Sequence, residues 1–437
     1  MALSPAPHGV ALRVAVVTET YPPEINGVAI TVARMVRGLR AEGHEVQVIR
    51  PRQPGDDDAR GAAGAGFDVL TRGIPIPRYP GLRMGWPCGT RLRRLWREAR
   101  PDVLHVATEG PLGWSAVRAA HALGIPCVSE FRTNFHAYSQ HYGVGCLQGA
   151  VLGYLRRFHN RCHATMTPTA ALAAELAKEG FERLRVVGRG VDTALFNPAR
   201  RSEDLRRQWG VEPEDLVVLS VGRLAPEKNL VLLERTASAI GLARPGTRLV
   251  VVGDGPCEAS MQGRWPGAVF AGRQRAEALA THYASGDLLL FPSLTETFGN
   301  VTLEAMASGL GVVAFRYGAA AEVIKDGCSG WLAPRGDANA FVGAAVGAAL
   351  KPSLLAKVRL AAAAKSQGLG WARVIGDLVE VYRRSIREGI PSTRHATETV
   401  GEWPADAVED GEPLVSRGGR WSLAAVRRIS AHEDPLP

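Results

Sequence analysis

The sequence predicts an α/β protein built from two Rossmann-like domains, whose parallel sheets face a central cleft. The chain has 437 residues, which is enough for two domains of ordinary size. Short apolar runs alternate with stretches of helical period, a pattern typical of parallel sheets covered by helices on both faces. The alternation stops once, at the turn-rich segment 189–198, and then starts again. Each half of the chain is therefore expected to supply its own sheet.

The first domain is expected to span residues 1–195. It opens with an apolar strand at 13–18, a loop that contains two prolines, and a helical stretch at 28–40. The later apolar runs are short enough for strands and are separated by helical patterns. They predict strands at 45–49, 103–106, 126–129 and 164–167, and helices at 113–123, 147–159 and 170–178.

The second domain is expected to span residues 196–370. Its apolar runs predict strands at 216–221, 248–252, 288–291, 311–314 and 330–332. Helices after residues 337 and 352 close the domain, and a further helix covers 371–387. Residues 388–437 are rich in Pro, Gly, Thr and acids without a sustained apolar period, which predicts a loose tail.

The composition fits a globular enzyme with a large core, since 46% of the residues are hydrophobic. No stretch approaches the roughly 18 consecutive apolar residues of a membrane span. The N-terminal residues show no signal-peptide pattern, so a cytoplasmic protein is expected. The cysteines are scattered without a Cys-x-x-Cys pair, which predicts free thiols at Cys88, Cys127, Cys146, Cys162, Cys257 and Cys328.

The net charge of +9 is unevenly placed. Between residues 72 and 100, a single acid faces eight arginines, at positions 72, 78, 83, 91, 93, 94, 97 and 100. Residues 91–97 have a helical pattern with Leu92, Leu95 and Trp96 on one side. Two interpretations stay open: a helix packed on the sheet with a solvated basic face, or a patch for anionic lipid at a membrane surface. No recognition motif accompanies the charge, so nucleic acid is not expected as a partner.

The segment 291–309 is the most informative part of the chain. Glu296 lies at the mouth of a helix predicted to open near Gly299 or Asn300, and Glu304 lies inside that helix. Eight helical positions separate two residues by roughly 12 Å, whereas the two carboxylates of a retaining glycosidase lie about 5 to 5.5 Å apart. Such a spacing suits two hydroxylated rings of one elongated ligand, with a phosphate bound between them by free amides at the helix N-terminus. The pattern therefore describes a nucleotide-sugar site.

This segment, with its Pro-Ser dipeptide, two glutamates and Leu-Glu-Ala-Met run, resembles the Glu-x7-Glu signature of the retaining glycosyltransferases of family 4, which have the GT-B fold. The resemblance runs from about residue 13 to 387. It implies that Glu304 holds ribose hydroxyls, that Glu296 holds the donor sugar, and that helix 371–387 crosses back onto the first domain. The donor-binding loop would comprise Thr297, Phe298, Gly299 and Asn300.

A second element, Gly222-Arg223 followed by Lys228-Asn229, lies between a predicted strand and a helix. Its cations therefore lie at the carboxyl edge of the second sheet, where ligands bind in open α/β folds. The element resembles the family's Gly-Arg and Lys-Asn pair, which implies that Arg223 and Lys228 neutralise the donor diphosphate. Fixed cations at this place stabilise the charge that develops on the leaving group without a metal ion.

Two further turns fit the same pocket. Gly253 follows a strand and allows a close approach of the backbone to a ligand. The segment 270–274, which includes Arg273, resembles the loop that edges the nucleobase, mainly through backbone contacts.

Three features of the first domain bear on the site. Gly27 stands between a strand and a helix, so it either brings amides to the phosphates or makes a plain tight turn. Many relatives carry a His that contacts the transferred sugar, and in this chain Arg132 occupies its place. Either His136 or Arg132 is therefore expected to contact the sugar or the acceptor. The acidic run Asp56–Asp58 lies in a loop without a flanking strand, so we reject it as a metal site.

The predicted function is a retaining hexosyltransferase that needs neither a metal nor a cofactor. Residues 1–195 would bind a lipid or glycan acceptor, and residues 196–370 a nucleotide-sugar, with GDP-mannose as the favoured donor. The opening 18–28 is most similar to relatives that make mannosylated or sulfoquinovosyl glycolipids. The enzyme would be cytoplasmic, with peripheral attachment to the inner membrane face through the basic segment as one possibility.

Three alternatives differ in what they do to a sugar. A UDP-sugar-dependent glycolipid transferase would have the same chemistry as the predicted hexosyltransferase. A nucleotide-sugar 2-epimerase would have the same fold, and a two-domain solute-binding protein would have a similar cleft between two domains. Epimerases interconvert sugars without forming a glycoside, and binding proteins turn nothing over. The lack of a signal-peptide pattern and the paired cations argue against the binding protein.

Overall fold

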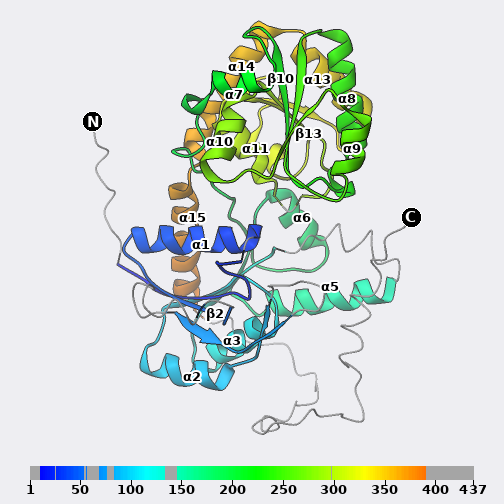
Figure 1. The fold of residues 1–437 in the computed structure, drawn as a ribbon. Coiled ribbons are helices and arrows are strands. Elements are labelled where there is room, and N and C mark those ends of the chain that lie inside the picture. Colours follow the sequence, from blue (N-terminus) through cyan, green and yellow to red (C-terminus); the bar gives the residue numbers. More distant parts are fainter. Residues whose placement is uncertain are drawn as a thin grey trace.

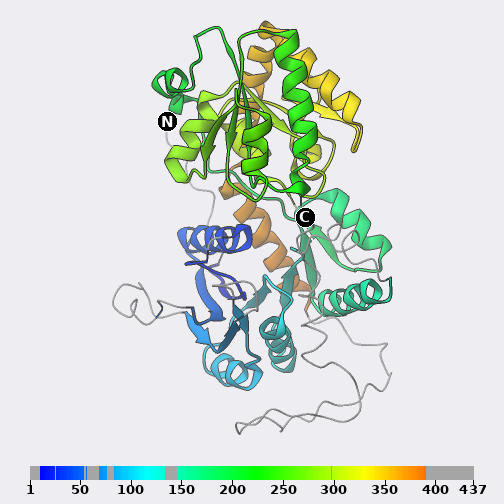
Figure 2. The same cartoon turned by 45° about the vertical axis from the view of Figure 1, so that its right-hand side comes forward.

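The computed structural model describes residues 10–24, 26–53, 56, 68–75, 83–132, 145–296 and 298–389. Two α/β units stand one above the other in Figures 1 and 2, and each is built around its own parallel sheet. Among the described helices, no single one is long and apolar enough to cross a membrane.

The N-terminal sheet has seven strands in the order β3-β2-β1-β6-β7-β8-β9, and all neighbours are parallel. The strands are β1 (Arg13–Val17), β2 (Glu45–Pro51), β3 (Val69–Thr71), β6 (Val103–Val106), β7 (Cys127–Glu130), β8 (Ala164–Thr167) and β9 (Leu184–Val186). The helices of this unit are α1 (Gly27–Ala41), α2 (Gly89–Glu98), α3 (Pro111–Ala122), α5 (Gly145–His159) and α6 (Ala170–Lys178). A separate antiparallel pair joins β4 (Gly73–Pro75) to β5 (Arg83–Gly85).

The C-terminal sheet has six parallel strands in the order β12-β11-β10-β13-β14-β15. The strands are β10 (Leu216–Val221), β11 (Thr247–Val252), β12 (Val269–Gly272), β13 (Leu288–Phe291), β14 (Gly311–Phe315) and β15 (Trp331–Ala333). The helices are α7 (Glu203–Gln208), α8 (Leu230–Ala243), α9 (Glu258–Arg264), α10 (Ala276–Ser285), α11 (Asn300–Ala307), α12 (Gly318–Val323), α13 (Ala338–Ala349) and α14 (Pro352–Ser366). The segment 270–274, interpreted above as a loop, is in fact the end of β12 and the turn after it.

Helix α15 (Trp371–Glu388) connects the two units. It leaves the C-terminal unit and lies beside α1 on the N-terminal sheet, as the orange helix in Figures 1 and 2 shows. Ile375, Leu378 and Tyr382 of α15 are buried in one cluster with residues of α1 and β1. The packing is close enough that a Cβ added at Gly38 would meet Ile375 Cγ1 at 2.6 Å. This helix therefore fixes one unit against the other.

Each sheet has a point where the strand order reverses. In the C-terminal sheet this point lies between β10 and β13, because β10 is flanked by β11 on one side and β13 on the other. Ligands bind in open α/β sheets outside the carboxyl ends of the strands at such points. A ligand is therefore expected at the loops that follow Val221 and Phe291.

Candidate active site

Two predicted elements meet at the carboxyl edge of the C-terminal sheet. The loop after β10 carries Arg223 and Lys228, and the loop after β13 carries Glu296. Because β10 and β13 are neighbours, Lys228 Nζ forms an ion pair with Glu296 Oε1. Both side chains are partly buried, at 25% and 16% exposure. Arg223 is more open, at 68% exposure, and Glu227 lies 4.0 Å away.

Two glycines at the carboxyl edge of the C-terminal sheet adopt backbone conformations that favour glycine. Gly222 and Gly253 adopt positive φ angles of 144° and 140°. A Cβ added at Gly253 would lie 1.9 Å from the carbonyl oxygen of Gly222, so a glycine at 253 is required by the packing of these two turns. Next to them, Arg273 Nε pairs with Asp254 Oδ1 at 3.0 Å, and both side chains are largely exposed.

The N-cap residue of α11 is Gly299, which has no side chain to cap the helix and adopts a φ of 95°. Among the described residues, no side chain accepts a hydrogen bond from the first helical amides. An α-helix leaves its first amide groups without internal partners, so such an end attracts an anion. Phe298 is buried, and the guanidinium of Arg189 lies over its ring at 5.6 Å. Thr297 lies outside the described residues.

Glu304 lies in α11, one turn after its first residue Asn300, and faces α10. Tyr283 Oη donates a hydrogen bond to Glu304 Oε2 at 3.0 Å. Burial raises the pKa of Glu304 above its ordinary value, and the Tyr283 hydrogen bond and the charge of Arg34 act in the opposite direction. Arg34 belongs to α1, so the other unit contributes to the electrostatics at this glutamate.

A cavity of about 540 Å³ lies between the two units. Both units and the segment that joins them line it, with Glu19, Thr20, Glu24, Asn26, Gly27, Val28, Arg83, Arg132, Arg189, Glu296, Phe298, Gly299 and Asn300. The predicted residues Gly27, Arg132, Glu296, Phe298, Gly299 and Asn300 therefore share one cavity. Arg223, Gly222 and Lys228 do not line this cavity; they line a separate, smaller hollow at the end of β10.

The N-terminal wall of the cavity begins at α1. Asn26 Oδ1 accepts a hydrogen bond from the amide of Ala29 at 2.8 Å and so caps the helix. A Cβ added at Gly27 would have nothing within 4 Å, so the start of α1 is open to the cavity. Glu19 also lies on this wall, and burial raises the pKa of its carboxyl to about 7.

Arg132 lies at the base of the same wall, directly after β7. Its guanidinium is ion-paired with Glu130 Oε2, and His105 Nε2 lies 3.3 Å from the other oxygen of that carboxylate. Burial alone would raise the pKa of Glu130, but Arg132 and His105 outweigh it and hold the pKa at about 2. His105 Nδ1 in turn lies 2.6 Å from Tyr382 Oη of α15. His136 lies outside the described residues, so only Arg132 is placed at the cavity.

The acidic run at 56–58 is only partly described. Asp56 is engaged by two hydrogen bonds from Arg50, at 2.7 and 2.9 Å, and by the amide of Gln53 at 2.6 Å. This carboxylate therefore stabilises the turn after β2. In the described part of the chain, no group of three or more His, Cys, Asp or Glu side chains is arranged to hold a metal ion.

Comparisons with known proteins identify the family of this chain. Residues 25–195 match the family described as Glycosyltransferase Family 4, and residues 215–349 match the one described as Glycosyl transferases group 1. The GDP-mannose-dependent alpha-mannosyltransferase of Mycolicibacterium smegmatis is 35% identical over 391 residues, which cover 86% of this chain and 100% of that protein. The chain belongs to glycosyltransferase family 4. A sulfoquinovosyl transferase of Arabidopsis thaliana is 32% identical and shares 74% of this chain and 64% of its own length.

Solved structures confirm the predicted GT-B fold of this family 4 member. The sucrose-phosphate synthase of Thermosynechococcus elongatus superposes with a TM-score of 0.69 at 18% identity, over 86% of this chain and 99% of that one. HepE of Anabaena, solved with UDP and glucose, superposes with a TM-score of 0.66 at 19% identity, over 85% and 100%. The family and its relatives make the chain a glycosyltransferase that uses a nucleotide sugar.

Several residues of the cavity wall were not predicted from the sequence. Glu19 and Glu24 lie in the loop 18–28, which the resemblance singled out without assigning them a role. Arg83 belongs to the basic segment, and Arg189 opens the turn-rich crossing between the units. A cation directly at a domain crossing is the signal that could have identified Arg189.

Proposed function

We propose that the protein is a retaining transferase that moves a hexose, with mannose from GDP-mannose as the favoured donor, to a hydroxyl group of a lipid or glycan. The donor would bind to the C-terminal unit, and the acceptor hydroxyl would attack from the N-terminal wall of the cavity. The leaving phosphate would assist deprotonation on the same face of the sugar. The mannosyltransferase of Mycolicibacterium smegmatis supports the choice of donor.

One observation supports the proposal more than any other: the two donor motifs meet through the ion pair between Lys228 and Glu296, beside the uncapped start of α11. Lys228 and Arg223 would neutralise the diphosphate, and the first amides of α11 would bind the same group. Glu296 would then lie where the sugar leaves the phosphate. Glu304, oriented by Tyr283, would hold the ribose hydroxyls.

A second donor class has support of its own. The sulfoquinovosyl transferase of Arabidopsis thaliana covers most of this chain, and the Anabaena protein was solved with UDP and glucose. A UDP-sugar-dependent glycolipid transferase would use the same cations, amides and glutamates. The two donor classes would differ in the nucleobase, which would be contacted largely by the backbone of segment 270–274.

The test is hydrolysis of a small panel of GDP- and UDP-sugars by the purified protein, in the absence of an acceptor. We expect slow release of one nucleoside diphosphate, with GDP-mannose as the best donor. A faster rate with a UDP-sugar would select the second donor class. Interconversion of two nucleotide sugars without release of a nucleoside diphosphate would contradict a transferase and point to an epimerase.

Activity is expected to be independent of divalent metal ions. Arg223, Lys228 and the amides at the start of α11 supply the positive charge that a bound metal would otherwise bring to the diphosphate. The rate should therefore stay unchanged in EDTA. A loss of activity in EDTA that Mg²⁺ or Mn²⁺ restores would count against this account of the site.

Peripheral attachment to an anionic membrane would rest on charge rather than on insertion. Leu92 and Trp96 of α2 are buried against the N-terminal unit, while Arg91, Arg94 and Arg97 of the same helix are exposed, as is Trp86 before it. Near them lies a hollow of about 610 Å³ lined by Arg52, Arg72, Arg83 and Arg91. Each cation near an anionic surface contributes about 1 kcal/mol at most.

We therefore expect the protein to co-sediment with anionic vesicles and not with neutral ones. Added salt should weaken the binding, because charges are screened over about 8 to 10 Å at 0.1 to 0.15 M. The double variant Arg93→Glu, Arg94→Glu should bind less. If the protein ignores anionic vesicles even at low salt, a soluble acceptor becomes the better assignment.

A further inference from the structure

Arg132 is a buried cation whose hydrogen-bonding capacity is only partly used. Its side chain is 6% exposed, and its partners are Glu130 and, at 3.6 Å, the sulfur of Met35. Its Nε and Nη1 atoms are buried and have no hydrogen-bond partner among the described residues. A buried charged donor without a partner is costly, so such a group is typical of a site that a ligand completes.

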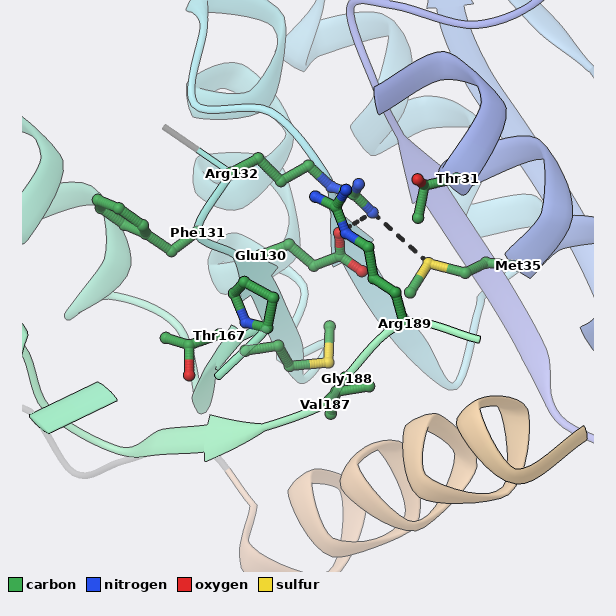
Figure 3. A pocket seen from close by; sticks show the side chains of 11 residues that line it. Thr31, Met35, Glu130, Phe131, Arg132, Thr167, Val187, Gly188 and Arg189 are labelled. Atoms are coloured by element: carbon green, nitrogen blue, oxygen red, sulfur yellow. Dashed lines mark hydrogen bonds and ion pairs between the residues drawn. The ribbon is translucent and has the colours of Figure 1, made fainter. Parts of the chain in front are cut away.

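A second guanidinium lies beside the first. Figure 3 shows the head groups of Arg132 and Arg189 gathered over the carboxylate of Glu130, although the two arginines come from different segments of the chain. Burial, followed by repulsion from Arg132, lowers the pKa of Arg189 to about 10. The charges of Glu130 and Glu296 act in the opposite direction and raise the pKa of Arg189, so two guanidiniums lie close together near these two carboxylates.

Both arginines border the cavity between the two units. Phe298 and Gly299 line this cavity with them. They are separate from the cations assigned to the diphosphate, since Arg223 and Lys228 follow β10 and line a different hollow. The diphosphate therefore does not account for Arg132 and Arg189.

We propose that Arg132 and Arg189 form a second anion subsite, which binds a carboxylate, sulfonate or phosphate carried by a substrate in addition to the donor diphosphate. Two adjacent guanidiniums match the paired oxygens of such a group through charge-assisted, bidentate hydrogen bonds. The anion belongs either to the transferred sugar or to the acceptor. The inference rests on the proposed function for the position of the diphosphate.

The test compares matched acidic and neutral sugars by isothermal titration calorimetry. For the donor, the pair is GDP-mannuronic acid and GDP-mannose; for the acceptor, it is methyl α-D-glucuronide and methyl α-D-glucoside. In one of the two pairs, we expect the acidic member to bind at least about tenfold tighter, as one charge-assisted contact provides. The pair that shows the preference identifies the substrate that carries the anion.

The preference should disappear in Arg132→Gln and in Arg189→Gln. Arg189→Gln leaves the Glu130 ion pair intact, so it keeps the test valid if Arg132→Gln fails to fold. Arg118→Gln, an exposed arginine of α3, is the matched control and should keep the preference. Equal affinities for both members of both pairs in the wild-type protein would overturn the subsite, as would a preference that survives both variants.

Titrations with GDP and UDP separate this inference from the proposed function. If a nucleotide binds but no acidic sugar is preferred, the subsite is wrong and the donor site stands. If neither nucleotide binds while methyl glucuronide still binds in an Arg189-dependent way, the subsite stands and the donor assignment is wrong.

Discussion

Lys228→Ala is expected to lower the rate of transfer by at least about tenfold, and Arg223→Ala to lower it by a similar factor. Each substitution removes a charge-assisted contact to the diphosphate, and such a contact contributes about 1.5 to 3 kcal/mol. Lys228→Ala should have the larger effect, because it also leaves Glu296 without its ion-pair partner. Initial rates of transfer or donor hydrolysis with the preferred donor measure the effect.

The matched control is Lys357→Ala, which removes an exposed lysine of α14 and should leave the rate unchanged. Thermal melts show whether the loss reflects unfolding. If both Lys228→Ala and Arg223→Ala turned over at the wild-type rate, the assignment of this edge to the diphosphate would be wrong.

The two glutamates of the signature are expected to give different kinetic defects. Glu296 lies beside the position proposed for the sugar, where positive charge builds as the glycosidic bond breaks. A carboxylate there helps most in the transition state, so Glu296→Gln should lower kcat by at least about tenfold and change the donor KM less. Glu304 would hold ribose in the ground state and the transition state alike, so Glu304→Gln should mainly raise the donor KM.

Steady-state kinetics with varied donor distinguish these defects, and Glu214→Gln, an exposed glutamate, is the control for a lost surface charge. A merely structural role would lower the melting temperature of both variants without a selective kinetic defect. Full kcat in Glu296→Gln, together with lost turnover of Glu304→Gln at saturating donor, would reverse the two roles.

The strands of both sheets were predictable where they are buried on both faces. The runs at 103–106, 216–221 and 288–291 match β6, β10 and β13 residue for residue, because a buried parallel strand is a nearly continuous apolar run. The run at 164–167 also matches β8, although two of its four residues are threonines. The short strands β3, β4, β5 and β9 were not predicted. They have only three residues each and are partly exposed, so no apolar run distinguishes them from loops.

The candidate site was predictable as two motifs but not as a cavity. Arg223, Lys228 and Glu296 are tied to strand ends, and the parallel sheet brings strand ends together. Arg189 and Glu19 reach the cavity only through the packing of one unit against the other, which α15 fixes and no local pattern records. Arg132 was expected as a contact, whereas its partner Glu130, two residues before it at the end of β7, and its neighbour Arg189 were not.

A nucleoside diphosphate that binds between the loop of Lys228 and the start of α11 should be detected by calorimetric titration with GDP and UDP. We expect the wild-type protein to bind at least one of the two nucleotides, and Lys228→Ala to weaken this binding about tenfold while Lys357→Ala does not. Unchanged affinity in Lys228→Ala, or no binding of either nucleotide to the wild-type protein, would contradict this assignment.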